Sequence, residues 1–153
     1  MKDFRKNILI IVFVLIIGVL STACESDQLI EEENTYLLKL NEITKKIIEK
    51  DGVAVQSILN SAYDSYGDLV ENIYFANASG KMILSPSLQL PEDYDARGRN
   101  WYKKALENEL YMPKPYKNVV IEKKIQSVSK AIYKDDVLIG VIGMEYELKG
   151  AYD

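Results

Sequence analysis

The spacing of apolar residues changes near Gly67, and this change constrains the fold more than any other feature of the sequence. Before Gly67 the apolar residues recur every three or four positions, as in amphipathic helices, and they predict helices over Asp27–Lys50 and Val53–Tyr66. After Gly67 the apolar residues form short runs or alternate with polar ones, which indicates β-strands. The predicted strands are Val70–Ala76, Lys81–Ser85, Val119–Ile121, Ile125–Tyr133 and Val137–Leu148.

Turn and loop residues separate these segments in an order that indicates one fold class. Asn77–Gly80 and Asp135-Asp136 are predicted turns, Pro86–Asp95 is a loop with two prolines, and Asn100–Asn108 is a predicted short helix. The order is therefore helix, helix, hairpin, short helix and then three strands. This order predicts an α+β domain in which helices pack against an antiparallel sheet.

The composition excludes several functional classes. The 153 residues include no histidine and one cysteine, which excludes a Ser-His-Asp triad, a His-ligated metal, an intrachain disulfide and a Cys-rich metal site. The net charge is −4 and no basic stripe is present, which argues against nucleic acid as a partner. Because paired-carboxylate and phosphate-loop motifs are also missing, we expect no enzymatic activity, no cofactor and no metal.

The first 23 residues have the pattern of a secretory signal peptide. Met1–Asn7 carries three basic residues, Ile8–Leu20 is an apolar run of 13 residues, and small residues then lead to Cys24. This end resembles the lipobox of bacterial lipoproteins, in which cleavage precedes a cysteine that receives a diacylglyceryl group. Lipidation of Cys24 is one interpretation, and an uncleaved membrane anchor is the other, since the run extended to Cys24 has 17 residues. Both place the remaining chain on the extracytoplasmic face of the cell membrane.

One segment concentrates the residue types that bind small anions. Tyr94–Tyr102 contains the only tryptophan of the chain, Trp101, together with two tyrosines and the arginines Arg97 and Arg99. An arginine fork binds a carboxylate through two parallel hydrogen bonds, and aromatic neighbours exclude water from the contact. The alternative interpretation is a loop that Trp101 anchors to the core, with both arginines exposed.

From Ile73 onward the chain resembles the extracytoplasmic Cache sensor family, whose domains have a PAS-like fold. The ligand module of that family has a hairpin, a YD-x-R-x-R-x-WY motif, a Pro-Tyr segment and a strand pair ending GV-x-G-x-D. The matching segments in this chain are Asn72–Ser85, Tyr94–Tyr102, Pro115–Asn118 and Gly140–Glu145.

The resemblance implies an architecture for the whole chain. It implies a PAS-like antiparallel sheet flanked by a long N-terminal helix and shorter helices. Residues 1–23 would then be the signal peptide or anchor, residues 24–50 the long helix, and residues 51–153 the ligand-binding domain.

The resemblance also implies a ligand site of the double Cache type. Asn118 and Glu145 each stand where amino-acid-binding members have an aspartate, so the half that holds the ligand's amino group differs from the family pattern. Arg97 is expected to be structural, paired with Asp93 or Asp95. The implied contacts are Tyr94, Arg99 and Trp101 for the ligand carboxylate, and Tyr102, Tyr116, Asn118 and Glu145 for its amino group.

We therefore expect a membrane-tethered sensor module that binds a small carboxylate-bearing ligand, such as an amino acid or an organic acid. It would pass ligand status to a separate membrane signalling protein, because the sequence contains neither a second membrane helix nor an output domain. The alternative is a structural or protein-interaction lipoprotein with no small-molecule ligand. A further expected partner is a second copy of the chain, paired through the apolar seam of the first helix at Tyr36, Leu40, Ile43 and Ile47.

Overall fold

The structure, a computed structural model, describes residues 31, 34–50, 53–118 and 123–148, with only the backbone of Asn118. The chain divides into two compact units, Met1–Tyr36 and Leu37–Asp153, and the following description concerns the second unit. Cys24 and the rest of the predicted signal peptide or anchor lie outside the described residues. The predicted strand Val119–Ile121 lies outside them as well.

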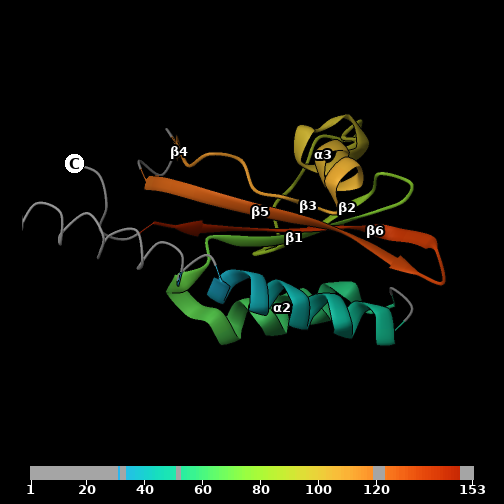
Figure 1. The fold of residues 1–153 in the computed structure, drawn as a ribbon, viewed down its shortest axis with the longest axis horizontal. Coiled ribbons are helices and arrows are strands. Elements are labelled where there is room, and N and C mark those ends of the chain that lie inside the picture. Colours follow the sequence, from blue (N-terminus) through green and yellow to red (C-terminus); the bar gives the residue numbers. More distant parts are fainter. Residues whose placement is uncertain (1–30, 32–33, 51–52, 119–122, 149–153) are drawn as a thin grey trace, which may run out of the picture. The chain divides into compact units, whose positions relative to one another are not determined.

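Helices cover both faces of an antiparallel sheet in the described part of the second unit (Figure 1). A helix over residues 37–49 and α2 (Val55–Tyr66) lie on one face, and α3 (Asn100–Asn108) lies on the other. Strand order is β2-β1-β6-β5-β3, and β4 also pairs with β5, so the predicted α+β fold is confirmed. The strands are β1 (Asn72–Asn77), β2 (Met82–Ser85), β3 (Leu110–Tyr111), β4 (Tyr116–Asn118), β5 (Lys123–Lys134) and β6 (Val137–Glu147).

Alternation along the central strands gives the sheet two chemically different faces. Side chains of successive strand residues point to opposite faces, and residues paired across antiparallel strands share a face. The face toward the two helices is apolar and buried, with Ile73, Phe75, Ile142, Met144 and Tyr146. The face toward α3 holds small, aromatic and polar residues, with Asn72, Tyr74 and Ala76 of β1 opposite Glu145, Gly143 and Val141 of β6. On strands β1 and β6, the polar side chains Asn72 and Glu145 therefore lie on the α3 face.

The helix over residues 37–49 packs through the apolar seam that its spacing predicts. Leu40, Ile43 and Ile47 are completely buried within the domain, whereas Leu38 on another face of the helix is 70% exposed. The seam expected to serve both the domain core and a neighbouring copy is thus filled by the core. Pairing of two copies through these three residues stays a prediction, and it would have to remove them from their present contacts.

Turn residues end the elements where the sequence indicates. Gly67 has a φ of +55°, and its backbone N–H donates to the Tyr63 carbonyl at the end of α2. Asp135 and Asp136 have φ of +49° and +62°, as a two-residue type I′ hairpin requires. The two-residue strand β3 was not predicted, because it has no alternation of its own and depends on pairing with β5.

Strand β2 lies at one edge of the sheet and has four residues. Helix α2 crosses near it, and the Gln56 side-chain amide donates to the Leu84 carbonyl at 2.9 Å. A carbonyl of the edge strand is therefore hydrogen-bonded to a helix within the same domain.

Truncation of one seam residue should test the packing of the first helix. We expect Leu40→Ala to lower the free energy of unfolding by about 2–5 kcal/mol, because it leaves a cavity in a fully buried site. Leu38→Ala is the matched control and should change that free energy by less than about 0.5 kcal/mol, because Leu38 is exposed. Urea denaturation followed by far-UV circular dichroism measures both. Equal effects of the two substitutions would contradict this packing.

Candidate ligand site

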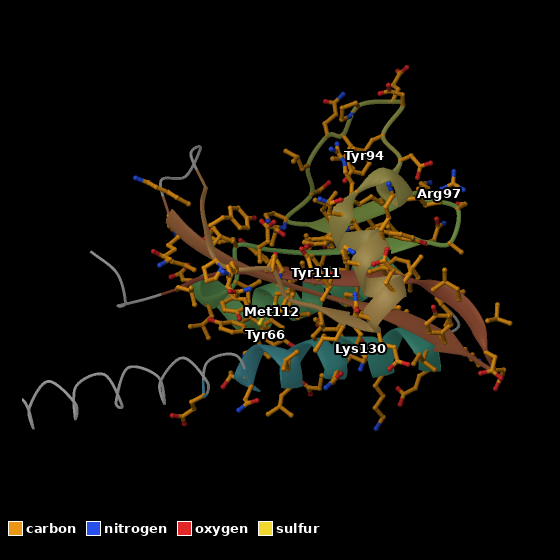
Figure 2. All side chains as sticks on the ribbon, turned by 45° about the horizontal axis from the view of Figure 1, so that its top comes forward. Tyr66, Tyr94, Arg97, Tyr111, Met112 and Lys130 are labelled. Carbon is orange, nitrogen blue, oxygen red and sulfur yellow. The ribbon has the colours of Figure 1, made fainter. Side chains whose placement is uncertain are left out.

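The segment that leads into α3 contains Tyr94 and Arg97, which Figure 2 labels, and one aspartate, Asp95, holds it in place. The Asp95 carboxylate accepts a hydrogen bond from the Arg97 backbone N–H at 2.9 Å and pairs with the Arg97 guanidinium at 2.7 Å. These hydrogen bonds from Arg97 lower the pKa of Asp95. Gly80, in the turn between β1 and β2, lies against this pair, and a Cβ there would collide with the Asp95 carboxylate. The predicted pairing of Arg97 with Asp95 is confirmed, and Arg97 has a structural contact.

Arg99, unlike Arg97, packs against an aromatic ring rather than against a carboxylate. Its guanidinium lies 4.8 Å from the centre of the Tyr94 ring, its side chain is exposed, and it makes no ion pair with any described residue. The ring holds the cation in place without neutralising it. An arginine held in this way is available to bind an anion. It borders a hollow of about 330 Å³ lined by Pro91, Asp93, Tyr94, Asp95, Gly98 and Arg99.

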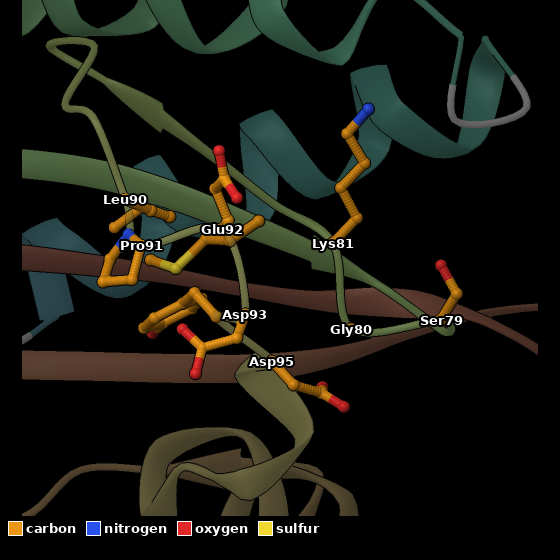
Figure 3. A pocket seen from close by; sticks show the side chains of 10 residues that line it. Ser79, Gly80, Lys81, Leu90, Pro91, Glu92, Asp93 and Asp95 are labelled. Atoms are coloured by element: carbon orange, nitrogen blue, oxygen red, sulfur yellow. The ribbon is translucent and has the colours of Figure 1, made fainter.

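A second hollow lies beside the first, between the β1–β2 turn and the loop before α3 (Figure 3). Its volume is about 480 Å³, and its walls are Ser79–Met82 and Leu90–Asp95. Tyr94 lines both hollows. Each volume falls in the range of roughly 300–1,000 Å³ in which proteins bind small molecules.

On the α3 face of the sheet, the aromatic side chain of Tyr74 packs against Trp101. The Tyr74 ring lies on Gly143 of the neighbouring strand, and a Cβ at Gly143 would collide with that ring. Trp101 packs edge-on against Tyr74, with ring centres 4.8 Å apart. The Ser129 hydroxyl donates to the Trp101 carbonyl at 3.0 Å and so fixes the first turn of α3 over β5. The motif residue Trp101 is thereby joined to the sheet.

Sequence reasoning missed Tyr74 as part of this region. Tyr74 lies between the buried residues Ile73 and Phe75, so its own strand reads as an apolar run rather than as an alternation. No local pattern marks Tyr74, because its place depends on the register that sets it opposite Gly143, a residue with no side chain to occupy the space above the strand.

Glu145 forms the acidic end of the region. Its carboxylate accepts a hydrogen bond from the Tyr116 hydroxyl at 3.0 Å and another from the Asn72 side-chain amide at 2.8 Å. Partial burial, followed by the charge and hydrogen bond of Glu145, raises the pKa of Tyr116 to about 12. Burial raises the pKa of Tyr74 well above 10.0, and Glu145, Tyr116 and Tyr94 raise it further. Tyr74 and Tyr116 therefore both lie close enough to Glu145 to feel its charge, and Tyr116 contacts it directly.

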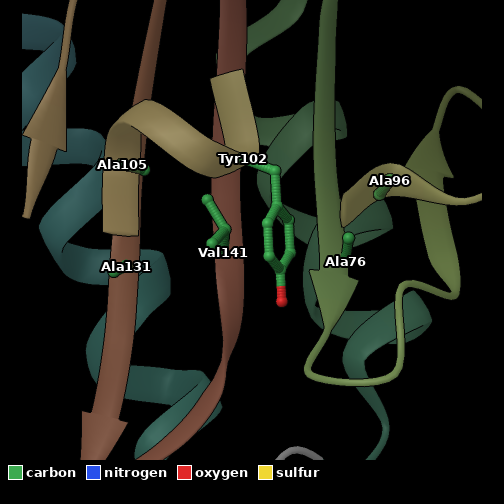
Figure 4. Packing of buried hydrophobic residues seen from close by; sticks show 6 residues of the cluster. All are labelled: Ala76, Ala96, Tyr102, Ala105, Ala131 and Val141. Carbon is green, nitrogen blue, oxygen red and sulfur yellow. The ribbon is translucent and has the colours of Figure 1, made fainter. Parts of the chain in front are cut away.

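Tyr102 differs from the other predicted contacts. It is only 2% exposed, and its ring packs among small residues between α3 and the sheet (Figure 4). Its hydroxyl donates to the Asn77 carbonyl at 3.1 Å, so this hydroxyl has a partner within the domain. The backbone of Asn118 pairs with Lys123 at the end of β4. The structure brings Tyr94, Arg99, Trp101, Tyr116 and Glu145 to the α3 face, and their contacts with a ligand stay predictions.

Comparisons with known proteins define the class of this domain. The family described as "Methyl-accepting chemotaxis protein-like, first PDC sensor domain" matches residues 39–150. The chain belongs to this family, which confirms the resemblance to extracytoplasmic sensor domains.

Individual relatives agree with this assignment. The methyl-accepting chemotaxis protein McpC of Bacillus subtilis is 38% identical over 84 residues, which are 54% of this chain and 12% of McpC. The ligand-binding domain of the Pseudomonas fluorescens chemoreceptor CtaA in complex with L-serine is 25% identical, with a TM-score of 0.62, over 74% of this chain and 50% of that one. The ligand-binding domain of the Campylobacter jejuni chemoreceptor Tlp3 in complex with 4-methylisoleucine is 28% identical, with a TM-score of 0.60, over 75% and 51%. The chain thus spans about an eighth of its curated relative McpC and about half of the two solved domains.

The contact between Tyr116 and Glu145 should be visible in the ionisation of one phenol. The difference in 295 nm absorbance between the parent chain and Tyr116→Phe should show a phenolate that forms near pH 12 rather than near pH 10. In a Glu145→Gln background the same difference should move toward pH 10, because the charge that opposes ionisation is removed. A transition near pH 10 in both backgrounds would show that the two side chains are not in contact in solution.

Proposed function

We propose that this chain is a sensor module that binds a small ligand through the ligand's carboxylate, and that amino acids are the ligand class. The observation that carries the proposal is the contrast between two arginines. Arg97 is paired with Asp95, whereas Arg99 is exposed and is held against Tyr94 at the edge of a hollow. The complexes of CtaA with L-serine and of Tlp3 with 4-methylisoleucine support the ligand class.

The charges of the site fit a ligand with two opposite ends. Arg99 would bind the carboxylate through parallel hydrogen bonds, with the Tyr94 ring against its guanidinium. Glu145, held by Tyr116, would supply the negative charge for an ammonium group. Trp101 and other aromatic residues would exclude water, which strengthens both ion pairs. The chemistry is binding rather than catalysis, and the ligand would leave unchanged.

Binding would act on the rest of the molecule through the loop before α3. A ligand that contacts both Arg99 and Glu145 connects this loop to strand β6. The ligand would then add a further contact to those that already join the loop and the sheet, and a membrane signalling protein would recognise the altered surface. The energy available for this change is limited by the difference in ligand affinity between the two states.

Two matched substitutions test the carboxylate contact. We expect Arg99→Ala to weaken binding of L-serine by roughly thirtyfold or more, because truncating one partner of a desolvated charge pair costs about 2–5 kcal/mol. Arg97→Ala is the control and should leave affinity within about twofold, because Arg97 is paired with Asp95. Isothermal titration calorimetry, with L-isoleucine as a second ligand, measures both. Equal affinity of Arg99→Ala and the parent for both ligands would exclude this site and favour a structural role for the loop.

We also propose that the chain is attached to the extracytoplasmic face of the membrane through its N-terminus. Among the described residues, no helix combines the length and the hydropathy that crossing a bilayer requires. The proposal therefore depends on the sequence of the first 24 residues. A diacylglyceryl group on Cys24 would provide two acyl chains, and two chains give stable attachment where one is marginal.

Replacement of the cysteine separates the two modes of attachment. We expect Cys24→Ala to abolish metabolic labelling with an alkyne fatty acid and to leave a precursor that is not cleaved. Cell fractionation should follow the same samples, because an uncleaved anchor would keep the variant on the membrane. Labelling of Cys24→Ala as strong as that of the parent would rule out lipidation at this residue.

A further inference from the structure

Asn72, which is not among the predicted ligand contacts, lies directly beside Glu145. The two residues are paired across β1 and β6, so their side chains share the α3 face of the sheet. They are 73 positions apart in the sequence, and the contact exists only because β1 pairs with β6. Asn72 is thus at the acidic end of the site through the register of the sheet.

The hydrogen bond to Glu145 determines which way the Asn72 amide points. An ionised carboxylate only accepts hydrogen bonds, so the amide nitrogen of Asn72 must face it, and Nδ2 donates to Glu145 Oε2 at 2.8 Å. The reverse orientation would place two acceptors against each other. The Asn72 Oδ1 atom is therefore directed away from Glu145.

Asn72 Oδ1 is buried and has no hydrogen-bond partner in the protein. A buried acceptor without a partner is costly, and such groups are rare in native proteins. By contrast, the hydroxyl of Tyr116 and the amide nitrogen of Asn72 already have a partner in Glu145. An unpartnered acceptor therefore belongs to a residue that contacts the Glu145 carboxylate.

We propose that Asn72 is a specificity-determining residue whose Oδ1 accepts a hydrogen bond from the ammonium group of the ligand. This inference rests on the proposed function. An ammonium group has three N–H donors, so it can bind Asn72 Oδ1 and a free lone pair of Glu145 together. A neutral hydroxyl or a water would satisfy Oδ1 but would gain much less from the charge of Glu145. Asn72 thus adds an acceptor to the half of the site in which Asn118 replaces an aspartate.

The surrounding charges favour this assignment. Lys123, at the start of β5, is bound to Glu71 at 2.6 Å and to Glu147 at 3.1 Å, so these contacts direct its charge away from Glu145. The phenol of Tyr116 stays protonated far above neutral pH, since its pKa is about 12. The hydrogen bonds described for Glu145 therefore come from two neutral side chains, Tyr116 and Asn72.

Matched ligands with and without the amino group test the proposal on the full chain in detergent. The pairs are L-serine with 3-hydroxypropionate and L-isoleucine with 3-methylpentanoate, measured by isothermal titration calorimetry. The parent should bind each amino acid at least about tenfold more tightly than its partner acid. Asn72→Leu should reduce that preference by about tenfold, while the affinity for the two plain acids changes by less than about twofold.

Two further variants control for indirect effects. Gln56→Leu makes the same replacement of an amide by an aliphatic side chain on α2, and it should leave the preference unchanged. Asn72→Ser keeps a small polar side chain that is too short to make both contacts. It replaces Asn72→Leu in the comparison if circular dichroism shows that the leucine variant is unfolded.

The outcomes separate this inference from the proposed function. A parent that binds plain acids as tightly as amino acids, or a preference that survives both Asn72 variants, overturns the role of Asn72 and leaves the carboxylate site intact. A parent that binds neither class of ligand overturns the proposed function and this inference together. Loss of the preference only in the Asn72 variants supports the assignment.

Discussion

Strand β6 presents alternate side chains to two environments, and both layers of the domain depend on its register. Met144 and Tyr146 are buried on the face toward the two helices, while Gly143 and Glu145 face α3. A slip by one residue would move the Glu145 carboxylate into an apolar core and Met144 into the site. The cost of burying an unpaired carboxylate excludes that alternative. The hydrophobic core on one face therefore fixes the position of the acidic group on the other.

The two ends of the site are supported differently. Glu145 and its neighbours stand on the central strands, where hydrogen bonds to both sides hold the backbone. Arg99 stands on a loop, and the short-range clamp between Asp95 and Arg97, seated against Gly80, holds that loop to the β1–β2 turn. The acidic group therefore depends on the register of the sheet, whereas the position of Arg99 depends on contacts between residues close to it in the sequence and the β1–β2 turn.

Local patterns predicted the elements well, because helices, turns and long strands depend on residues close in sequence. Helix α3 has the bounds expected from the sequence, and the turn at Asp135-Asp136 and the pairing of Arg97 with Asp95 were also expected. The contacts that the sequence did not reveal are long-range ones. The placement of Tyr74 on Gly143 and the bond between Asn72 and Glu145 require the register of β1 against β6, which no local pattern contains. The motif resemblance predicted the region of the site, and the fold showed which side chains lie beside the predicted residues.

The edge strand β2 has a consequence for how copies of the domain can meet. An exposed strand edge is a template on which another chain can add a strand, and such growth leads to aggregation. Here the edge strand is only four residues long and Pro86 follows it. The Leu84 carbonyl already accepts a hydrogen bond from the Gln56 side chain. Backbone growth from this edge is therefore blocked after very few hydrogen bonds. Copies of the domain that lie close together are therefore not expected to join their sheets through β2. Any contact between two copies at this edge must come from side chains.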